Sequence, residues 1–146
     1  MTSPTPSPFW TEEDIISRYT RADGLRDGEL VAAPLGLTRE AGISIPVAMT
    51  RAVWAGYVSP HYLSQLRDQD ETGRLWDLLW MLRMAAMNSR GASIIHFKVI
   101  FALMQSRAGR NGQYLRRESQ TITLKAVCGP GDDCEPVITV MLPGED

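Results

Sequence analysis

The sequence predicts an α+β fold, with helices in the first part of the chain and an antiparallel sheet at its C-terminal end. Three observations carry this prediction. Helix-capping patterns recur in the first half, the stretch from Thr72 to Asn88 is apolar on most sides of a helix, and apolar and polar residues alternate after Gly91. The length of 146 residues is that of one domain.

The N-terminal segment is expected to begin with a tail. Residues 1–8 are rich in Pro, Ser and Thr and have little to bury, so we expect a disordered tail there and a single α+β domain over residues 9–146. Order should begin at Phe9 and Trp10. Thr11, followed by three acidic residues, indicates a helix start, with a short strand over residues 15–19 as the alternative.

A second helix is predicted from a capping pattern. Thr20 and Asp23 have the spacing of a capping box, and Gly28 fits a C-terminal stop. A short extended piece should follow over residues 29–31, then a break over residues 34–36 and one helical turn over residues 38–41. Pro46 is expected to open a further helix whose buried face includes Val47, and a short helix should cover residues 61–67.

The strongest helical pattern runs from Thr72 to Asn88, capped by Asp70 or Thr72. Its polar stripe is narrow and passes through Arg74 and Asp77. A helix this apolar normally lies at the centre of a core. The alternative is that part of it faces a partner or a twin subunit, which leaves a homodimer open beside a monomer.

The last third of the chain predicts a three-stranded antiparallel meander. Ile95, Phe97, Val99, Phe101 and Leu103 fall on one face of the first strand. Residues 121–128 alternate again, and residues 136–142 form the third strand. We expect residues 106–120 to be a loop and residues 129–133 to be a hairpin turn.

Composition argues against several classes of protein. The formal net charge of −2 is neither that of a basic nucleic-acid binder nor that of a strongly acidic DNA mimic. The start of the chain lacks the pattern of a signal peptide, and no apolar run is long enough to cross a bilayer. With two cysteines, this favours a cytoplasmic protein without membrane contact.

The C-terminal end supplies one candidate site. Asp132, Asp133 and Glu135 form an acidic turn that could dock a basic partner, or simply be solvated. They lack the spacing of a calcium loop. Cys128 and Cys134 lack the further ligands of a zinc site and are expected to be ordinary thiols, with a cross-hairpin disulfide as the alternative. No metal or cofactor is expected.

The segment from residue 107 to 117 supplies the other candidate site. Four arginines could bind an anion, and Tyr114 could stack on a base; a mobile loop with scattered charge is the alternative. No nucleotide-binding loop or nucleophile motif accompanies them. His96, on the more polar face of its strand, lacks a neighbouring catalytic set. The four candidate anion ligands are Arg107, Arg110, Arg116 and Arg117.

Several stretches resemble an uncharacterised family of short bacterial proteins encoded on plasmids and integrative mobile elements. They are Tyr19–Ala22, Arg39–Gly42, Arg74–Asp77 and the segment from Leu124 to Thr139. The resemblance covers most of residues 15–146. Two features depart from the family pattern: the insert over residues 107–120 is long, and Cys134 stands where a Gly is more usual.

The resemblance implies a setting and no catalytic residues. It favours a non-enzymatic protein-interaction module that binds a host or element-encoded protein complex, as an inhibitor of a host defence system. One alternative is a small enzyme acting on a nucleotide or nucleic acid, because Tyr19, Thr20 and Arg21 resemble the opening of ADP-ribosyl-transferring folds, with His96 as the further candidate. The other is nucleic-acid binding through residues 107–117.

Overall fold

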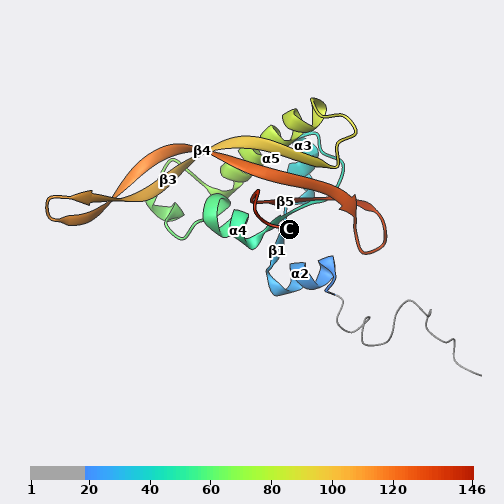
Figure 1. Cartoon of the computed structure of the whole chain (residues 1–146), viewed down its shortest axis with the longest axis horizontal. Helices are drawn as coiled ribbons and strands as arrows, with labels where there is room; N and C mark the ends of the chain where they lie inside the picture. Colours follow the sequence, from blue (N-terminus) through green and yellow to red (C-terminus); the bar gives the residue numbers. More distant parts are fainter. Residues whose placement is uncertain (1–18) are drawn as a thin grey trace, which may run out of the picture.

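The computed structural model describes residues 19–146 and shows a mixed α+β arrangement, which confirms the fold class (Figure 1). The tail over residues 1–8, the start of order at Phe9 and the helix at Thr11 lie outside the described residues. The elements are α2 (Arg21–Asp27), β1 (Leu30–Ala32), α3 (Leu35–Glu40), β2 (Val47–Thr50), α4 (Arg51–Val53), a π-helical turn (Trp54–Val58), a 3₁₀ turn (Leu63–Gln65), α5 (Glu71–Met87), β3 (Ile94–Gly109), β4 (Gly112–Pro130) and β5 (Pro136–Met141).

The sheet has five strands in the order β1-β2-β5-β4-β3. The predicted three-stranded antiparallel meander is therefore wrong. Strand β5 pairs antiparallel with β4 on one side and parallel with β2 on the other, so the C-terminal strands are part of a larger mixed sheet. Among the strands of the described residues, β1 and β3 lie at its edges.

The helix predicted to open at Pro46 is wrong at its start, because Val47–Thr50 is strand β2. Val47, Ala48 and Met49 are all buried. A strand buried on both faces has a continuous apolar run and loses the alternation that would reveal it. Helical structure begins only at Arg51, where the Thr50 side chain caps α4.

Local capping determines the start of the described chain. The Thr20 hydroxyl accepts from the Asp23 N–H, the Asp23 carboxylate accepts from the Thr20 N–H, and Gly28 ends α2 at a φ of 82°. The predicted helix and its two ends are confirmed. The short extended piece is β1, the break over residues 34–36 is instead the start of α3, and the helix over residues 61–67 shrinks to a 3₁₀ turn.

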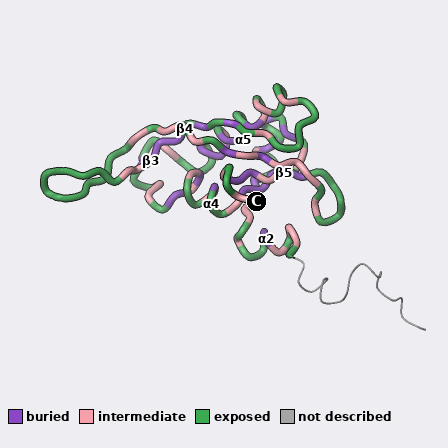
Figure 2. The backbone as a smooth tube through the Cα atoms, viewed as in Figure 1, coloured by how far each residue is buried: buried purple, intermediate pink, exposed green. Residues whose placement is uncertain are grey.

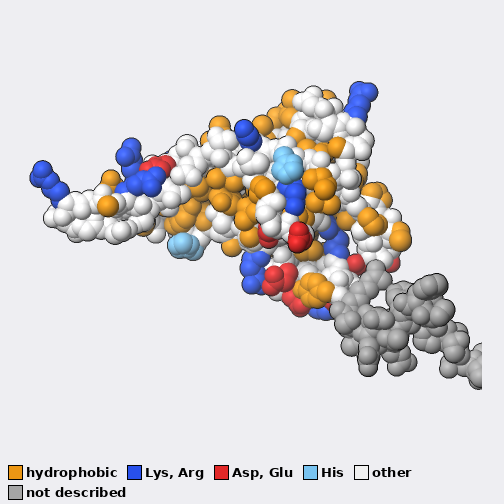
Figure 3. Space-filling view, in the orientation of Figure 1, with side chains coloured by type: hydrophobic (Ala, Val, Ile, Leu, Met, Phe, Trp, Pro, Cys, Tyr) orange, Lys and Arg blue, Asp and Glu red, His pale blue; other side chains and the backbone are white. Residues whose placement is uncertain are grey.

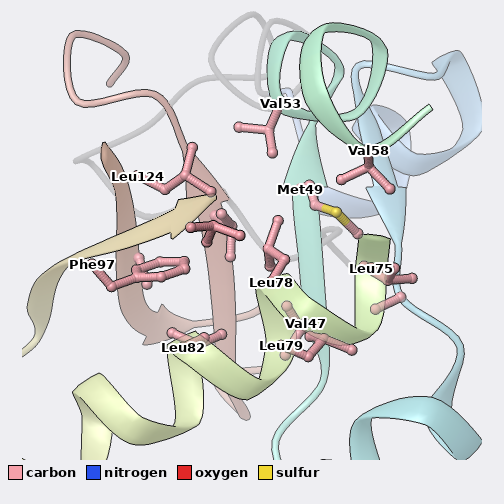
Figure 4. Packing of buried hydrophobic residues seen from close by; sticks show 14 of the residues in the cluster. Val47, Met49, Val53, Val58, Leu75, Leu78, Leu79, Leu82, Phe97 and Leu124 are labelled. Carbon is pink, nitrogen blue, oxygen red and sulfur yellow. The ribbon is translucent and has the colours of Figure 1, made fainter. Parts of the chain in front are cut away.

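Helix α5 packs against the sheet and supplies much of the core. Asp70 caps it, and its side chain accepts from the Gly73 N–H at 2.6 Å. Figure 4 shows Leu78, Leu79 and Leu82 against side chains of β2, β3 and β4. Leu78 and Leu79 are fully buried. The other side of α5 exposes apolar side chains: Trp80, Met81, Met84 and Met87.

A buried arginine joins α5 to two other elements. Arg74 is only 2% exposed. Its guanidinium donates to the Tyr57 carbonyl from Nε at 2.9 Å and from Nη2 at 2.6 Å, and to the Ala102 carbonyl from Nη1 at 2.9 Å. It also lies 5.1 Å from the Phe101 ring centroid. Burial lowers the pKa of Arg74, and nearby Tyr62 and Asp77 oppose that shift.

Strands β3 and β4 form a long hairpin that reaches beyond the rest of the fold (Figure 1). They pair in continuous register from Ile94 opposite Val127 to Gly109 opposite Gly112. The loop predicted over residues 106–120 is therefore wrong. Apolar alternation stops there because no helix of residues 19–146 covers this part of the ribbon, while the backbone ladder continues to the tip. Residues 106–117 are all exposed (Figure 2), and we call this segment the arm.

Candidate interaction surfaces

The acidic turn is tied to the N-terminus of α2. Asp132 accepts hydrogen bonds from the backbone N–H groups of Arg21 and Ala22, each at 2.9 Å. Arg21 in turn reaches β5, donating to the Thr139 hydroxyl at 2.6 Å and to the Ile138 carbonyl at 3.0 Å. Asp132 therefore attaches α2 to the sheet, a role that sequence spacing alone could not reveal.

The rest of the turn is stabilised by hydrogen bonds within it. The Glu135 carboxylate accepts from the Asp133 N–H at 2.9 Å, and the Gly131 N–H donates to the Glu135 backbone carbonyl. Cys134 has a φ of 64°, in the left-handed region that favours glycine. Cys128 and Cys134 are free thiols, half-buried and exposed respectively. Asp133 and Glu135 are exposed, and docking through the acidic turn stays a prediction.

The four candidate arginines lie on the arm but have different surroundings. Arg107 forms a bidentate pair with Glu118, with Nε to Oε1 at 2.8 Å. Arg117 forms another with Asp68, at 2.6 and 2.8 Å, which links β4 to the loop before α5. Within residues 19–146, Arg110 and Arg116 form no ion pair.

These pairs shift the ionisation of their partners. The hydrogen bond from Arg117 lowers the pKa of Asp68 to about 2, and the hydrogen bond from Arg107 lowers the pKa of Glu118. Each carboxylate therefore stays charged well into the acid range. Figure 3 shows basic side chains along the arm, with acidic side chains beside some of them.

The residues of the alternative enzyme hypothesis have local contacts. Tyr19 donates its hydroxyl to Asp27 at 3.0 Å, and Thr20 caps α2. Arg21 binds β5, as described above. His96 lies on β3 opposite Lys125 and is exposed, with β4 between it and β5.

No strand of residues 19–146 pairs with the outer side of β3, and this open edge is a surface that the sequence did not identify. Backbone groups of an antiparallel strand point alternately toward and away from the partner strand. The Ser93 carbonyl accepts from Cys128 on β4, whereas the Ala102 carbonyl accepts from Arg74, away from β4. Because the register is continuous, the N–H and C=O groups of Lys98 and Ile100 also point outward.

An apolar hollow of about 330 Å³ lies beside this open edge. Trp80 and Met81 of α5 form one wall, and each is 41% exposed. Ile100 on the strand is 67% exposed. The apolar residues on the exposed side of α5 were a weak signal for this surface in the sequence. Nothing in the sequence indicated that the edge of β3 lies beside them. The lining residues are Asp77, Trp80, Met81, Lys98, Val99, Ile100 and Thr121.

Within the described chain, no three His, Cys, Asp or Glu side chains are grouped so that they could bind a metal ion. Among the same residues, no helix has the length and hydropathy needed to cross a membrane.

Comparison with known proteins places the chain in a family. No curated protein matches it, and no solved structure matches it. One family model matches residues 7–146, which is nearly the whole chain and includes every surface described above. The chain belongs to a family of unknown function, DUF6573.

Proposed function

We propose that this protein is a non-enzymatic protein-interaction module that binds an extended segment of a partner protein along the open edge of β3. The observation that supports this is the combination of outward backbone groups at Lys98 and Ile100 with the adjoining apolar hollow. Added strands gain affinity from main-chain hydrogen bonds and specificity from pockets for alternate side chains. Trp80 and Met81 would receive the apolar side chains of the added strand.

Arg74 limits where such a segment can pair. It occupies the outward carbonyl of Ala102 at 2.9 Å, so the open stretch ends there. The hollow lies over Lys98 to Ile100, before that point. An added strand therefore centres on Lys98 and Ile100 and leaves the arm free.

The test uses a substitution that removes one outward donor. Proline is tolerated on an edge strand where its missing N–H faces solvent. Lys98→Pro should therefore leave the β3–β4 ladder intact and block strand addition, whereas the matched Lys98→Ala keeps the N–H. Thermal unfolding of each variant checks whether both remain folded.

Affinity capture from a bacterial lysate, with the tagged full chain, compares the wild type with both variants. We expect one stoichiometric partner with wild type and Lys98→Ala and its loss with Lys98→Pro. Equal capture by all three would refute binding at this edge, and so would capture of nothing by folded wild type. Size-exclusion chromatography tests whether the partner is a second copy of the chain. In that case wild type and Lys98→Ala should have the mass of a dimer and Lys98→Pro the mass of a monomer.

The wider setting of this proposal comes from the family resemblance. We propose that the protein is encoded on a plasmid or integrative element, acts in the bacterial cytoplasm, and inhibits a host defence complex. Co-expression with a defence system, followed by phage plaque counts, tests this role. Plaque numbers should rise with wild type and not with Lys98→Pro, and unchanged numbers across a panel of defence systems would count against it.

A further inference from the structure

The β3–β4 hairpin is basic on an otherwise acidic protein. Between Ile94 and Cys128 the chain contains six Lys or Arg residues and a single carboxylate, Glu118, although its net charge is −2. The formal charge of the hairpin is therefore +5, and the acidic residues are concentrated elsewhere. The six basic residues are Lys98, Arg107, Arg110, Arg116, Arg117 and Lys125.

The arm is attached to the body in a defined direction. A two-stranded ribbon is at best marginally stable on its own in water. Two bidentate ion pairs counter this weakness, Arg107 with Glu118 across the ribbon and Arg117 with Asp68 to the body. The planar fork of arginine makes such pairs geometrically specific. Two arginines thus orient the arm, which leaves Arg110 and Arg116 for an external anion.

The tip of the arm is a tight turn that presents two polar side chains. Arg110 and Asn111 lie between Gly109 and Gly112, which pair with each other, and Gly112 has a φ of 110°. A Cβ added at Gly109 would meet the Tyr114 ring at 3.0 Å, so the aromatic ring packs closely over the turn. Arginine and asparagine are the side chains best suited to bidentate hydrogen bonds with guanine and adenine edges.

The dimensions of the arm suit one kind of groove. From the pair of Ser106 with Leu115 to the pair of Gly109 with Gly112, each strand of the arm has four residues, which span about 13 Å at about 3.3 Å per residue. The major groove of B-DNA is about 12 Å wide and about 8.5 Å deep and admits a two-stranded β-ribbon. The major groove of A-form RNA is too deep and narrow for side chains to read.

We propose that the arm binds double-stranded DNA by entering its major groove, with Arg110 and Asn111 at the base edges and Arg116 at the phosphates. This site is separate from the β3 edge at Lys98 and Ile100, so the two proposals can fail independently. Contacts with phosphates make the affinity depend on salt, since each neutralised phosphate releases condensed cations.

Fluorescence anisotropy with a labelled B-form DNA duplex tests this, using the full chain at several salt concentrations. The test variant is Arg110→Gln with Arg116→Gln, which keeps both ion pairs of the arm. The control is Arg39→Gln with Arg90→Gln, which makes the same change in charge at exposed positions outside the hairpin strands. Circular dichroism checks that all proteins are folded.

We expect wild type and the control to bind duplex DNA, with a linear fall of log affinity against log salt. The test variant should bind at least about 10-fold more weakly, and its salt slope should be smaller by about 1, because Arg116 is placed at the phosphates and Arg110 at the base edges. Lys98→Pro should bind DNA like wild type.

Several results would overturn the proposal. One is that wild type does not bind duplex DNA at about 50 mM salt. Another is that the test and control variants lose DNA affinity to the same extent. Equal affinity for single-stranded DNA or for an RNA duplex would exclude insertion into the major groove. If polyglutamate displaced the labelled duplex as well as unlabelled duplex DNA does, the arm would recognise an acidic protein surface and not DNA.

Discussion

Removal of the Arg74 guanidinium should destabilise the fold more than any other single arginine change in the described chain. The side chain is 2% exposed and donates to the backbone carbonyls of Tyr57 and Ala102. These carbonyls belong to the π-helical turn and to β3, so one guanidinium joins three elements. Arg74→Met keeps an apolar chain of similar length and removes all the donors.

The magnitude follows from the hydrogen bonds that would be lost. A hydrogen bond to a charged group contributes about 1.5–3 kcal/mol, and a buried acceptor left unsatisfied costs about 1–3 kcal/mol. Part of this loss is offset, because Arg74 forms no ion pair within the described chain and the substitution removes the cost of burying its charge. For two carbonyls we expect a net loss of about 3 kcal/mol. At about 3 °C per kcal/mol, Tm should fall by about 9 °C.

Urea unfolding followed by circular dichroism measures this loss directly. Arg83→Met on the same helix is the matched control. Its half-buried guanidinium lies 5.7 Å from the Trp80 ring centroid, so we expect a cost of about 0.5–1 kcal/mol. If Arg74→Met unfolds within about 0.5 kcal/mol of wild type, the carbonyls find other donors and the reasoning fails.

Three further predictions follow from the turn and from the base of the arm. An NMR titration should place the pKa of Asp68 near 2, and Arg117→Gln should return it toward 3.8. Because the folded pKa is lowered, the ion pair stabilises the fold above the unfolded pKa, and this contribution is lost as pH falls from about 4 to about 2. An unshifted pKa of Asp68 would contradict the ion pair. Cys134→Gly should raise the free energy of unfolding by about 0.5–1 kcal/mol, because its φ of 64° strains a side chain, and a loss of stability would show that the thiol makes a needed contact. Asp132→Ala should cost about 1 kcal/mol by freeing two N–H groups of α2, whereas Asp133→Ala should cost little, and equal effects of the two substitutions would contradict the assigned cap.

The two hypotheses that the structure leaves as predictions have direct tests. Replacing Asp132, Asp133 and Glu135 with their amides should weaken partner capture and its salt dependence if the acidic turn docks a basic surface. Heat on mixing with a dinucleotide in calorimetry would favour the enzyme hypothesis based on Tyr19 to Arg21, and no heat from folded protein would count against it.

The sequence by itself determined the elements whose signals are local. Thr20 and Asp23 contact each other three residues apart, so the start of α2 was predictable, as was its end at Gly28. Asp70 and the apolar run after it predicted α5 in the same way. In β3, alternation survived because one face is buried against α5 and the other is exposed. The α+β class follows from the order of these elements.

The candidate sites were only partly predictable. Sequence composition pointed to the arginines at residues 107–117 and to the acidic turn, because charge is visible without a fold. It could not show that Arg107 and Arg117 are paired with carboxylates, or that Asp132 caps a helix whose start lies 111 residues earlier. It could not show that the backbone edge of β3 is open, since strand order is set by pairing between distant segments.

Tertiary structure alone decided three features. Val47 to Thr50 became a strand because the space between β1 and β5 buries both of its faces, which overrides the helix signal of Pro46. Arg74 is stable in the core because its guanidinium donates hydrogen bonds to the carbonyls of Tyr57 and Ala102, which are distant in sequence. The arm is extended because the β3–β4 ladder continues to its tip and pairs the backbone groups that face the partner strand, although this part of the hairpin is exposed. In each case the deciding energy comes from burial or hydrogen bonding between segments far apart in the chain, and no short stretch of sequence contains that information.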